Sequence, residues 1–430
     1  MSDTHPSIRK LYSLELFGIK LGLQNLAELL QRLENPQDGL KFIHVAGTNG
    51  KGSVCAILSK SLQGANFNVG FFSSPHLVTI RERFRFNNRG ITETELTSFI
   101  DEIWPHIDAL YAKDVKITFF EATVAIALLY YKKKNCDFVV WETGMGGRLD
   151  GTNIVNPILT AITTINYDHQ QYLGDTLEKI AYEKAGIIKK GVPLFTGDIL
   201  ESPLKLILER ADKLGCKTHL FDDSILHFQN SETYFKGLDF SIKDSPEIYR
   251  LSTNGVYQKK NLALALSLIS YLSKIYKFDI SSALSALKDL KWHARCQLLP
   301  DGKILDGAHN QEGIEALVSS MKNSFHKDKF TVIFGCLEER NPTNVIKTLS
   351  SIAEKFIFTG ITTNRKSCEP IKIINLMKNS IGFSTECSTA QSPKEALRLA
   401  GNSKTLIAGS LYLAGEILRE YYTEDYITII

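Results

Sequence analysis

The chain lacks the features that mark exported or membrane-bound proteins. Its seven cysteines, at positions 55, 136, 216, 296, 336, 368 and 387, are odd in number and form no C-x-x-C pair, which argues against a disulfide framework or a zinc site. Residues 1–6 contain no apolar signal core, and the most apolar stretch, 119–131, is too short to cross a bilayer and carries Glu121. We therefore expect a cytoplasmic protein with reduced thiols.

The charge is also nearly balanced. A net charge of +3 over 430 residues gives no reason to expect a nucleic acid or an anionic membrane as partner. The hydrophobic content of 43% is enough for a core in each of two domains, which is the soft expectation at this length. We expect a monomer whose partners are small molecules.

Apolar runs of strand length alternate with helical patterns along most of the chain. This alternation predicts α/β architecture, with parallel sheets covered by helices. A turn-rich break at 298–302 marks a boundary, giving domains 1–297 and 298–430, and the polar segment 221–251 suggests a small antiparallel excursion within the first domain. The strands expected are 42–46, 69–73, 138–142, 159–165, 192–196, 304–306, 331–334, 355–358 and 406–408.

A glycine-rich turn joins the strand expected at 42–46 to a helical stretch that begins at Val54. Such a turn lets backbone N–H groups face a phosphate, while Lys51 can reach a terminal phosphate and Ser53 can offer a hydroxyl to Mg²⁺. A plain strand-to-helix connection is the alternative. We expect ATP to bind the loop formed by Gly47, Thr48, Asn49, Gly50, Lys51, Gly52 and Ser53, in which Gly52 departs from the usual phosphate-loop spelling.

Two further strand ends carry polar groups, and open α/β sheets bind ligands at such ends. Glu142 closes an apolar strand before a glycine-rich turn, where a carboxylate can hold the Mg²⁺ that bridges ATP phosphates. Asp168 and His169 follow the strand expected at 159–165. The alternatives are an exposed glutamate for Glu142, and a turn or a cap for the Asp-His pair.

Lys184 occupies an unusual position for a lysine. Helical spacing places it on one stripe with Leu177, Ile180, Ala181 and Ile188, which points it toward the buried side. It can snorkel or pair with Glu178 or Glu183. The alternative is that burial removes its charge, so that the amine reacts with CO₂ to give a carbamate able to bind a metal.

Several motifs in collinear order resemble the folylpolyglutamate synthase and dihydrofolate synthase family of the Mur ligase superfamily. They cover nearly the whole chain, and together they are far more specific than any one alone. The matching segments are residues 47–53, Ser73-Ser74-Pro75-His76-Leu77 leading to 81–84, 142–150, 168–169, 183–187, Asp306-Gly307-Ala308-His309-Asn310 and 409–416.

The resemblance implies an N-terminal P-loop ATPase-like Mur ligase domain that binds ATP and pterin, followed by a smaller Rossmann-like domain that binds glutamate. It implies an amide ligase of folate biosynthesis that joins L-glutamate to dihydropteroate or folates through an acyl phosphate. Lys51, His169 and Lys184 are the implied catalytic residues. Ser53, Ser73 and Glu142 are the implied ligands of a first Mg²⁺, and His169 with N6-carboxylated Lys184 those of a second metal; K⁺ is a further candidate cation.

Other roles follow from the resemblance alone. Asn261 and Arg295 match nucleotide-contacting residues, Asp306 matches one that binds ribose, and His309 and Ser410 match the nucleotide or glutamate side. A helix N-cap at the head of a helix expected over 261–271 is the alternative for Asn261. Salt bridges or caps are the alternatives for the other four. The chain departs from the family in having His293-Ala294 before Arg295, where Pro-Gly is usual.

The implied pterin and substrate surface consists of Ser74, Pro75, His76, Arg83, Phe120 and Asp150. An aromatic face and a carboxylate suit a flat heterocycle with N–H donors, although Phe120 can equally be a core residue. We expect an enzyme with both folate activities; the alternatives are one restricted to a single activity, another Mur-type ligase, or a P-loop kinase or nucleotide switch.

Overall fold

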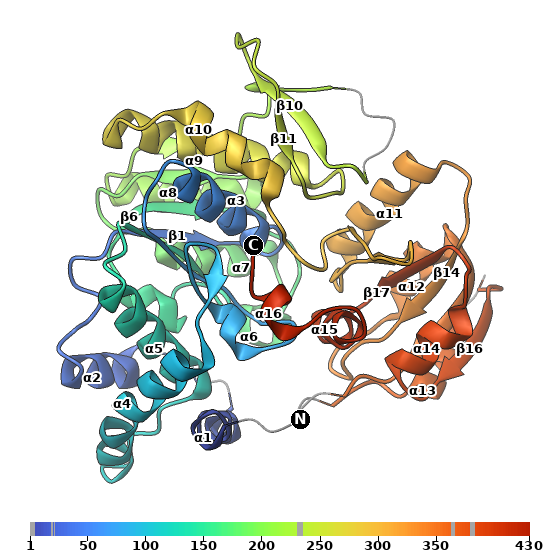
Figure 1. The fold of residues 1–430 in the computed structure, drawn as a ribbon, viewed down its shortest axis with the longest axis horizontal. Coiled ribbons are helices and arrows are strands. Elements are labelled where there is room, and N and C mark those ends of the chain that lie inside the picture. The colour runs from blue at the N-terminus through green and yellow to red at the C-terminus, as the bar shows by residue number, and fades with distance from the viewer. Residues whose placement is uncertain (1–4, 19, 21, 230–234, 363–365, 379–382) are drawn as a thin grey trace.

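The computed structural model describes residues 5–18, 20, 22–229, 235–362, 366–378 and 383–430. These residues form two lobes that lie side by side, with the first lobe in blue to yellow and the second in orange to red (Figure 1). Each lobe is built on its own sheet, as the alternating sequence pattern predicts.

The first lobe contains an eight-stranded sheet in the order β4-β3-β2-β5-β1-β6-β7-β8. The strands from β2 to β8 in this order run parallel, whereas β3 and β4 add an antiparallel edge. The bounds are β1 Phe42–Ala46, β2 Val69–Phe72, β3 Phe84–Phe86, β4 Arg89–Gly90, β5 Phe138–Glu142, β6 Pro157–Ile162, β7 Leu194–Thr196 and β8 Thr218–His219.

Helices cover both faces of this sheet, which explains why its central strands are apolar throughout. Successive residues of β5 point to opposite faces: Val140 packs in the core beside α3 and α9, and Trp141 in the core beside α4 and α5. The helices of this lobe are α1 Pro6–Ser13, α2 Gln24–Arg32, α3 Lys51–Gly64, α4 Glu93–Tyr111, α5 Phe119–Lys133, α6 Gln170–Leu173, α7 Leu177–Lys184, α8 Glu201–Lys213, α9 Gln258–Tyr276 and α10 Ile280–Ser285, with 3₁₀ turns at Leu14–Phe17, Ile80–Arg83, Gly151–Ile154, Ala185–Ile187 and Ala286–Asp289.

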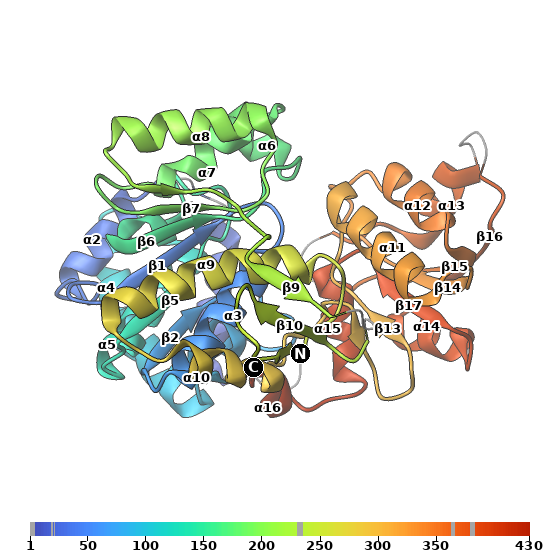
Figure 2. The same cartoon turned by 90° about the horizontal axis from the view of Figure 1, so that it is seen from above.

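A small antiparallel sheet interrupts the first lobe where the sequence indicates an excursion. It consists of β9 (Leu226–Phe228), β10 (Leu238–Ile242) and β11 (Tyr249–Leu251) in the order β11-β10-β9. Its apolar residues, among them Phe240 and Leu251, join the core formed by α3 and α9. Figure 2 shows this sheet beside α9, on the side that faces the second lobe.

The second lobe is a six-stranded sheet in the order β12-β13-β17-β14-β15-β16, parallel except for β12. The bounds are β12 Gln297–Leu298, β13 Ile304–Leu305, β14 Phe330–Phe334, β15 Ala353–Thr359, β16 Glu386–Ala390 and β17 Thr405–Ala408. The helices α11 Gln311–Phe325, α12 Thr343–Ser350 and α13 Pro370–Lys378 share one core, and α14 Pro393–Ala400 and α15 Leu411–Arg419 share another. This is the Rossmann-like arrangement expected of a doubly wound sheet.

The last helix, α16 (Glu424–Ile427), lies back against the first lobe (Figure 1). Ile429 forms an antiparallel bridge with Arg89, and the Gly90 N–H donates to the Thr428 carbonyl at 3.0 Å. β12 spans the sequence-predicted boundary and pairs with β13. The lobes are therefore connected twice, once before β12 and once through this returning segment.

The sequence predicts the central strands well and the edge strands poorly. The strands at 42–46 and 138–142 are confirmed to the residue, whereas the strand expected at 159–165 ends at Ile162. Strands β3, β4, β8, β12 and β16 were not expected. β16 is mostly exposed and polar, so it carries no apolar signal.

All seven cysteines are free. Across the described part of the chain, no helix is both long enough and apolar enough to span a membrane.

Candidate active site

A cleft of about 2030 Å³ lies between the lobes and is lined by both. It brings together most of the residues singled out by the sequence. These are Thr48, Asn49, Gly50, Lys51, Gly52, Ser53, Ser74, Pro75, His76, Arg83, Phe120, Glu142, Asp150, His169, Asn261, Arg295, Asp306, His309 and Ser410. Gly47, Ser73 and Lys184 do not line the cleft.

The glycine-rich loop adopts backbone conformations that only glycine tolerates easily. Gly47 has φ 149° and Gly50 has φ 84°. A Cβ atom at Gly47 would lie 1.9 Å from Thr163 Oγ1, and one at Gly50 would lie 2.4 Å from Asn261 Oδ1. Neighbouring residues therefore pack tightly against the loop, and α3 starts within it, at Lys51 rather than at Val54 as expected. This is a phosphate cradle at a helix N-terminus.

Two lysines converge on one carbonyl of this loop. Lys51 Nζ donates to Gly47 O at 3.0 Å and to Thr48 O at 3.2 Å, and Lys184 Nζ donates to Gly47 O at 2.8 Å. Lys184 is only 4% exposed. Burial, together with the charge of Lys51, lowers the pKa of Lys184 to about 7. Lys184 can therefore be a neutral amine near pH 7.

The inward orientation of Lys184 is confirmed, but the pairing alternative is wrong. Glu183 forms an ion pair with Arg148 at 2.9 Å, and Glu178 accepts a hydrogen bond from Ser202. Lys184 is the last residue of α7, and its side chain points away from both acids toward the glycine-rich loop.

Glu142 and the serines beside it supply the oxygen atoms that Mg²⁺ prefers. Burial raises the pKa of Glu142 to about 6 although Lys51 opposes the shift, and the Ser74 N–H donates to its carboxylate at 3.3 Å. A Cβ atom on Gly52 would lie 3.5 Å from Glu142 Oε1, so the carboxylate lies against the loop. Ser73 Oγ accepts from Arg85 Nη1 at 3.0 Å, so Arg85 shares this oxygen with any bound ion.

Within the described residues, no three histidine, cysteine or acidic side chains cluster closely enough to form a metal site on their own. An ion here needs ligand oxygens from phosphates, which is the usual way proteins bind Mg²⁺ with nucleotides. Ser53 and Glu142, which line the cleft, fit that mode, whereas Ser73 is buried outside the cleft lining.

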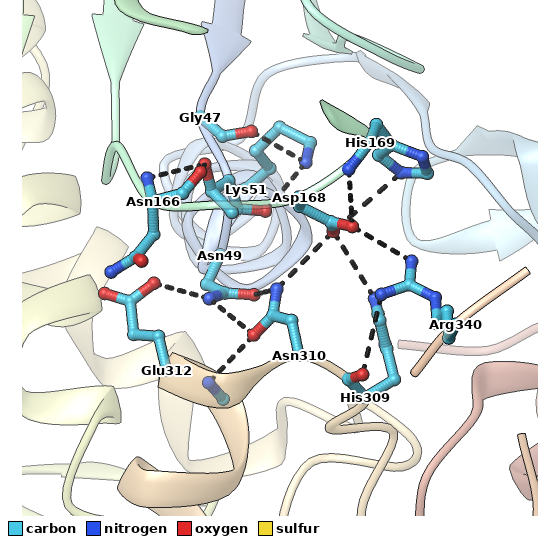
Figure 3. A network of polar contacts seen from close by, with 12 residues as sticks. Gly47, Asn49, Lys51, Asn166, Asp168, His169, His309, Asn310, Glu312 and Arg340 are labelled. Carbon is cyan, nitrogen blue, oxygen red and sulfur yellow. Dashed lines mark hydrogen bonds and ion pairs between the residues drawn. The ribbon is translucent and has the colours of Figure 1, made fainter. Parts of the chain in front are cut away.

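Asp168 is the centre of the polar network beside the glycine-rich loop, and His169 is one of its partners (Figure 3). Its carboxylate lies 3.0 Å from Arg340 Nη2 and 3.7 Å from His309 Nε2, both in the second lobe, and 3.8 Å from His169 Nε2. Burial would raise the pKa of Asp168, but the His309 hydrogen bond and the nearby charges hold it below its usual value. His169 has a left-handed backbone, φ 51°, and burial lowers its pKa to about 4.

A second set of contacts joins the glycine-rich loop to α11. Asn49 Nδ2 donates to Asn310 Oδ1 at 3.1 Å and to Glu312, while Asn310 Nδ2 donates back to Asn49 Oδ1 at 3.0 Å (Figure 3). Asn310 also caps α11 by accepting from the Gly313 N–H. The phosphate loop is therefore in direct contact with the second lobe.

Asp306 and Arg295 line the second-lobe side of the cleft. The Asp306 carboxylate accepts from Tyr257 Oη at 2.7 Å and from the N–H groups of Cys296 and Ala308, both at 2.7 Å. Ala294 has φ 54°, so the position where the family usually has glycine keeps a left-handed backbone. The backbone around Arg295 thus does not require the usual glycine.

The expected start of the helix around Asn261 is wrong. α9 begins at Gln258 and its N-cap is Tyr257, so Asn261 lies within the first turn and does not cap it. Asn261 Nδ2 donates to Gln258 Oε1 at 2.8 Å, and its oxygen lies against Gly50.

Phe120 and Asp150 line the cleft together. A Cβ atom on Gly144 would lie 2.6 Å from Phe120 Cζ and 3.0 Å from Asp150 Oδ2, so both side chains converge over this glycine. The Asp150 carboxylate also accepts from Met145 N at 2.8 Å and caps the turn at 151–154. Phe120 is therefore a cleft residue as well as a packing residue.

Arg83 and His76 also line the cleft. Arg83 Nε donates to His76 Nδ1 at 2.9 Å, Tyr12 Oη lies 3.4 Å from His76 Nε2, and Arg83 sits over the Phe119 ring. The loop of Ser74 and Pro75 continues into 77–79, whose N–H groups donate to the Glu82 carboxylate. Ser410 lies across the cleft and caps α15 through Tyr412 N.

Some cleft residues gave no usable sequence signal. Arg340, Asn310, Glu312, Tyr257 and Tyr12 all line the cleft or contact its predicted residues. Asn310 belongs to the motif at 306–310, but the motif did not indicate a role for this residue. A lone arginine in the loop after β14 shows its purpose only when the fold brings it to Asp168.

Two family models match most of the chain. "Mur ligase middle domain" matches residues 45–269, and "Mur ligase, glutamate ligase domain" matches residues 294–411. The matched segments contain the phosphate loop and the second-lobe cleft residues, respectively.

Curated relatives and solved structures agree with these matches. A Bacillus subtilis protein named dihydrofolate synthase/folylpolyglutamate synthase is 36% identical over 93% of this chain and 95% of its own. The Saccharomyces cerevisiae dihydrofolate synthetase is 30% identical over 94% and 98%. A crystal structure of Thermotoga maritima folylpolyglutamate synthase, 31% identical, superposes with a TM-score of 0.83 over 96% of each chain. A structure of Escherichia coli FolC in complex with DHPP and ADP, 26% identical, gives 0.82 over 97% and 98%.

The packing behind the phosphate loop can be measured with a matched pair of glycines. Gly50 and Gly302 have nearly the same backbone, φ 84° and φ 85°, but a Cβ atom meets Asn261 only at Gly50 and finds open space at Gly302. Gly302→Ala should cost about 1 kcal/mol of unfolding free energy from backbone strain alone. Gly50→Ala should cost about 1–3 kcal/mol more because the methyl group is overpacked, and should weaken ATP binding. Urea unfolding and nucleotide titration check this; equal losses in the two variants would contradict the packed loop.

Proposed function

Because this chain belongs to the dihydrofolate synthase/folylpolyglutamate synthase family of Mur ligases, we propose that it is an ATP-dependent ligase that adds L-glutamate to dihydropteroate and to folates. The observation that carries the proposal is one cleft whose lining includes both the phosphate loop and the pair Phe120 and Asp150. A carboxylate substrate bound in this cleft would share it with the terminal phosphate of ATP.

In this proposal the phosphate loop, residues 47–53, binds the ATP phosphates through its N–H groups and the α3 N-terminus. Asn261 lies against the loop, and the rest of the nucleotide is contacted by Arg295, just before β12, and by Asp306 of the second lobe. Lys51, which rests on the carbonyls of Gly47 and Thr48, compensates charge on the transferring phosphoryl group.

Ser53, Ser73 and Glu142 would hold Mg²⁺ at the phosphates. When bound, the ion neutralises phosphate charge, and K⁺ is a further candidate cation. The raised pKa of Glu142 supports this assignment, because a buried carboxylate gains from a cation beside it.

Lys184 is proposed to carry a carbamate and, with His169, to hold a second metal. Support comes from its burial and its lowered pKa, since only a neutral amine attacks CO₂. The carbamate would replace the repulsion between two ammonium groups at Gly47 O with attraction to Lys51.

The reaction divides into two steps. The γ-phosphate passes from ATP to the substrate carboxylate, which gives an acyl phosphate, and the glutamate amine then displaces phosphate through a tetrahedral intermediate. Arg340, His309 and Ser410 line the second-lobe side and are proposed to bind glutamate, with the Arg340 guanidinium suited to a carboxylate. Positioning and charge compensation then provide most of the rate.

The pterin is proposed to lie on Phe120, with Asp150 accepting from its N–H groups. Ser74, Pro75, His76 and Arg83 form the side of that pocket. We also propose a cytoplasmic monomer with domains 1–297 and 298–430. An enzyme with only one of the two folate activities is the alternative within the family.

Substrate dependence separates these possibilities. Purified protein with ATP and Mg²⁺ should release phosphate only when L-glutamate and either dihydropteroate or a reduced folate are both present, and mass spectrometry of the product counts the glutamates added. Turnover without glutamate would point to a kinase or a nucleotide switch instead. Turnover that depends on UDP-linked muramyl substrates would point to another Mur ligase.

The carbamate on Lys184 makes a distinct prediction. Lys184→Ala should lose most activity and regain part of it with added short carboxylic acids, because an anion can occupy the vacated position. Lys184→Arg should be inactive and not rescued, since arginine keeps a positive charge where an anion is needed. Steady-state rates with and without acetate check this; a fully active Lys184→Arg enzyme would defeat the assignment and leave the ligase proposal in place.

A further inference from the structure

Two cysteines face each other across a short antiparallel contact in the second lobe. Leu337 and Ser367 form an isolated antiparallel bridge. The Cys368 N–H donates to Cys336 O at 2.9 Å, and the Glu338 N–H donates to the Lys366 carbonyl at 2.9 Å. These two hydrogen bonds lie on either side of the Leu337–Ser367 pair, which is itself not hydrogen-bonded. In this antiparallel register the next residues along, Cys336 and Cys368, are directly opposite each other.

Opposite residues at such a position have Cα atoms about 5.5 Å apart, within the roughly 4.4–6.8 Å that a disulfide requires. Each thiol also shifts the pKa of the other, so the two side chains lie close together. We propose that Cys336 and Cys368 are a reversible disulfide site whose oxidation ties down the loop that carries Arg340.

The environments of the two thiols assign their order of reaction. Cys368 is 7% exposed, and the neighbouring Cys336 lowers the pKa of its thiol. Cys336 is 2% exposed, and the neighbouring Cys368, together with burial, raises the pKa of its thiol. Because Cys368 is the more exposed of the two, we assign it as the attacking thiolate and Cys336 as the resolving one.

The chemistry is thiol–disulfide exchange with a low-molecular-weight disulfide, RSSR. The Cys368 thiolate attacks one sulfur, which forms a mixed disulfide and releases one RSH after protonation. The Cys336 thiolate then attacks Cys368 Sγ, which forms the internal disulfide and releases the second RSH. Two protein thiols are oxidised and one RSSR is reduced to two RSH, so atoms and electrons balance.

The other five thiols are in less reactive settings. Burial raises the pKa of each: Cys55, Cys136, Cys216, Cys296 and Cys387. Cys136 and Cys387 are more exposed than Cys336 and Cys368. The choice of Cys336 and Cys368 as the disulfide site therefore rests on their opposed positions and not on exposure.

The loop between the bridge and α12 reaches the cleft. Leu337 and Arg340 line it, and Arg340 contacts Asp168. Closing the disulfide brings the two sulfurs to about 2.05 Å from each other, which draws the segments around 336 and 368 together. Oxidation should therefore move Arg340. Its effect on glutamate rests on the proposed function; the disulfide itself does not.

The full-length protein, reduced and then incubated with oxidised glutathione, should form this disulfide. After blocking with N-ethylmaleimide, five of the seven cysteines should be alkylated. Trypsin should then give a cross-linked pair of peptides, 330–340 and 367–372, two hydrogens lighter than their sum. Cys336→Ser and Cys368→Ser should each abolish the cross-link, whereas Cys136→Ser, which removes a partly buried thiol elsewhere, should leave it intact.

Dithiothreitol should reverse the cross-link. Alkylation of all seven cysteines, or a disulfide between other cysteines, would overturn the site. In the kinetic arm, the oxidised protein should show a KM for glutamate raised several-fold with the KM for ATP nearly unchanged, and Cys368→Ser should be insensitive to oxidised glutathione. A cross-link that changes neither KM would contradict the claim that oxidation acts on the cleft through Arg340. A protein without glutamate-dependent turnover would refute the proposed function, while the peptide map would still decide on the disulfide.

Discussion

The glycine-rich side of the cleft depends on two lysine side chains that share one hydrogen-bond acceptor, the carbonyl oxygen of Gly47. Two lysines, one from α3 and one from the end of α7, donate to this single oxygen atom. Burial, and secondly repulsion from Lys51, lowers the pKa of Lys184, the more buried of the two, to about 7. This repulsion favours the loss of a proton from Lys184. It also means that a negative group bound nearby, either phosphate or a carbamate, would stabilise the site.

The same loop couples the lobes. Asn49 bonds to Asn310 and Glu312 of the second lobe, and Asp168 meets Arg340 and His309 a short distance away. In the proposed function, a nucleotide on the loop and a carboxylate at Arg340 would both act on this connected network. The returning segment with α16 adds a second connection near β4.

The sequence predicts those elements whose burial in the fold is visible as a local pattern of apolar residues. β1 and β5 are buried on both faces, so their bounds follow from continuous apolar runs. The inward face of Lys184 follows from helical spacing. Edge strands such as β16 lack that apolar signal. The start of α9 was missed because Tyr257, a residue with no side-chain cap bond, precedes it. The partnership of Arg340 with Asp168 is a long-range contact, which no local pattern encodes.

The central claim is that the cleft activates a substrate carboxylate by phosphorylation before an amine attacks. Folate substrate labelled with ¹⁸O in its reacting carboxylate tests this directly, with ATP and L-glutamate present. An acyl phosphate intermediate transfers one labelled oxygen to the phosphate released, and mass spectrometry should find one ¹⁸O per phosphate. Phosphate free of label in a reaction that forms the amide would contradict the account.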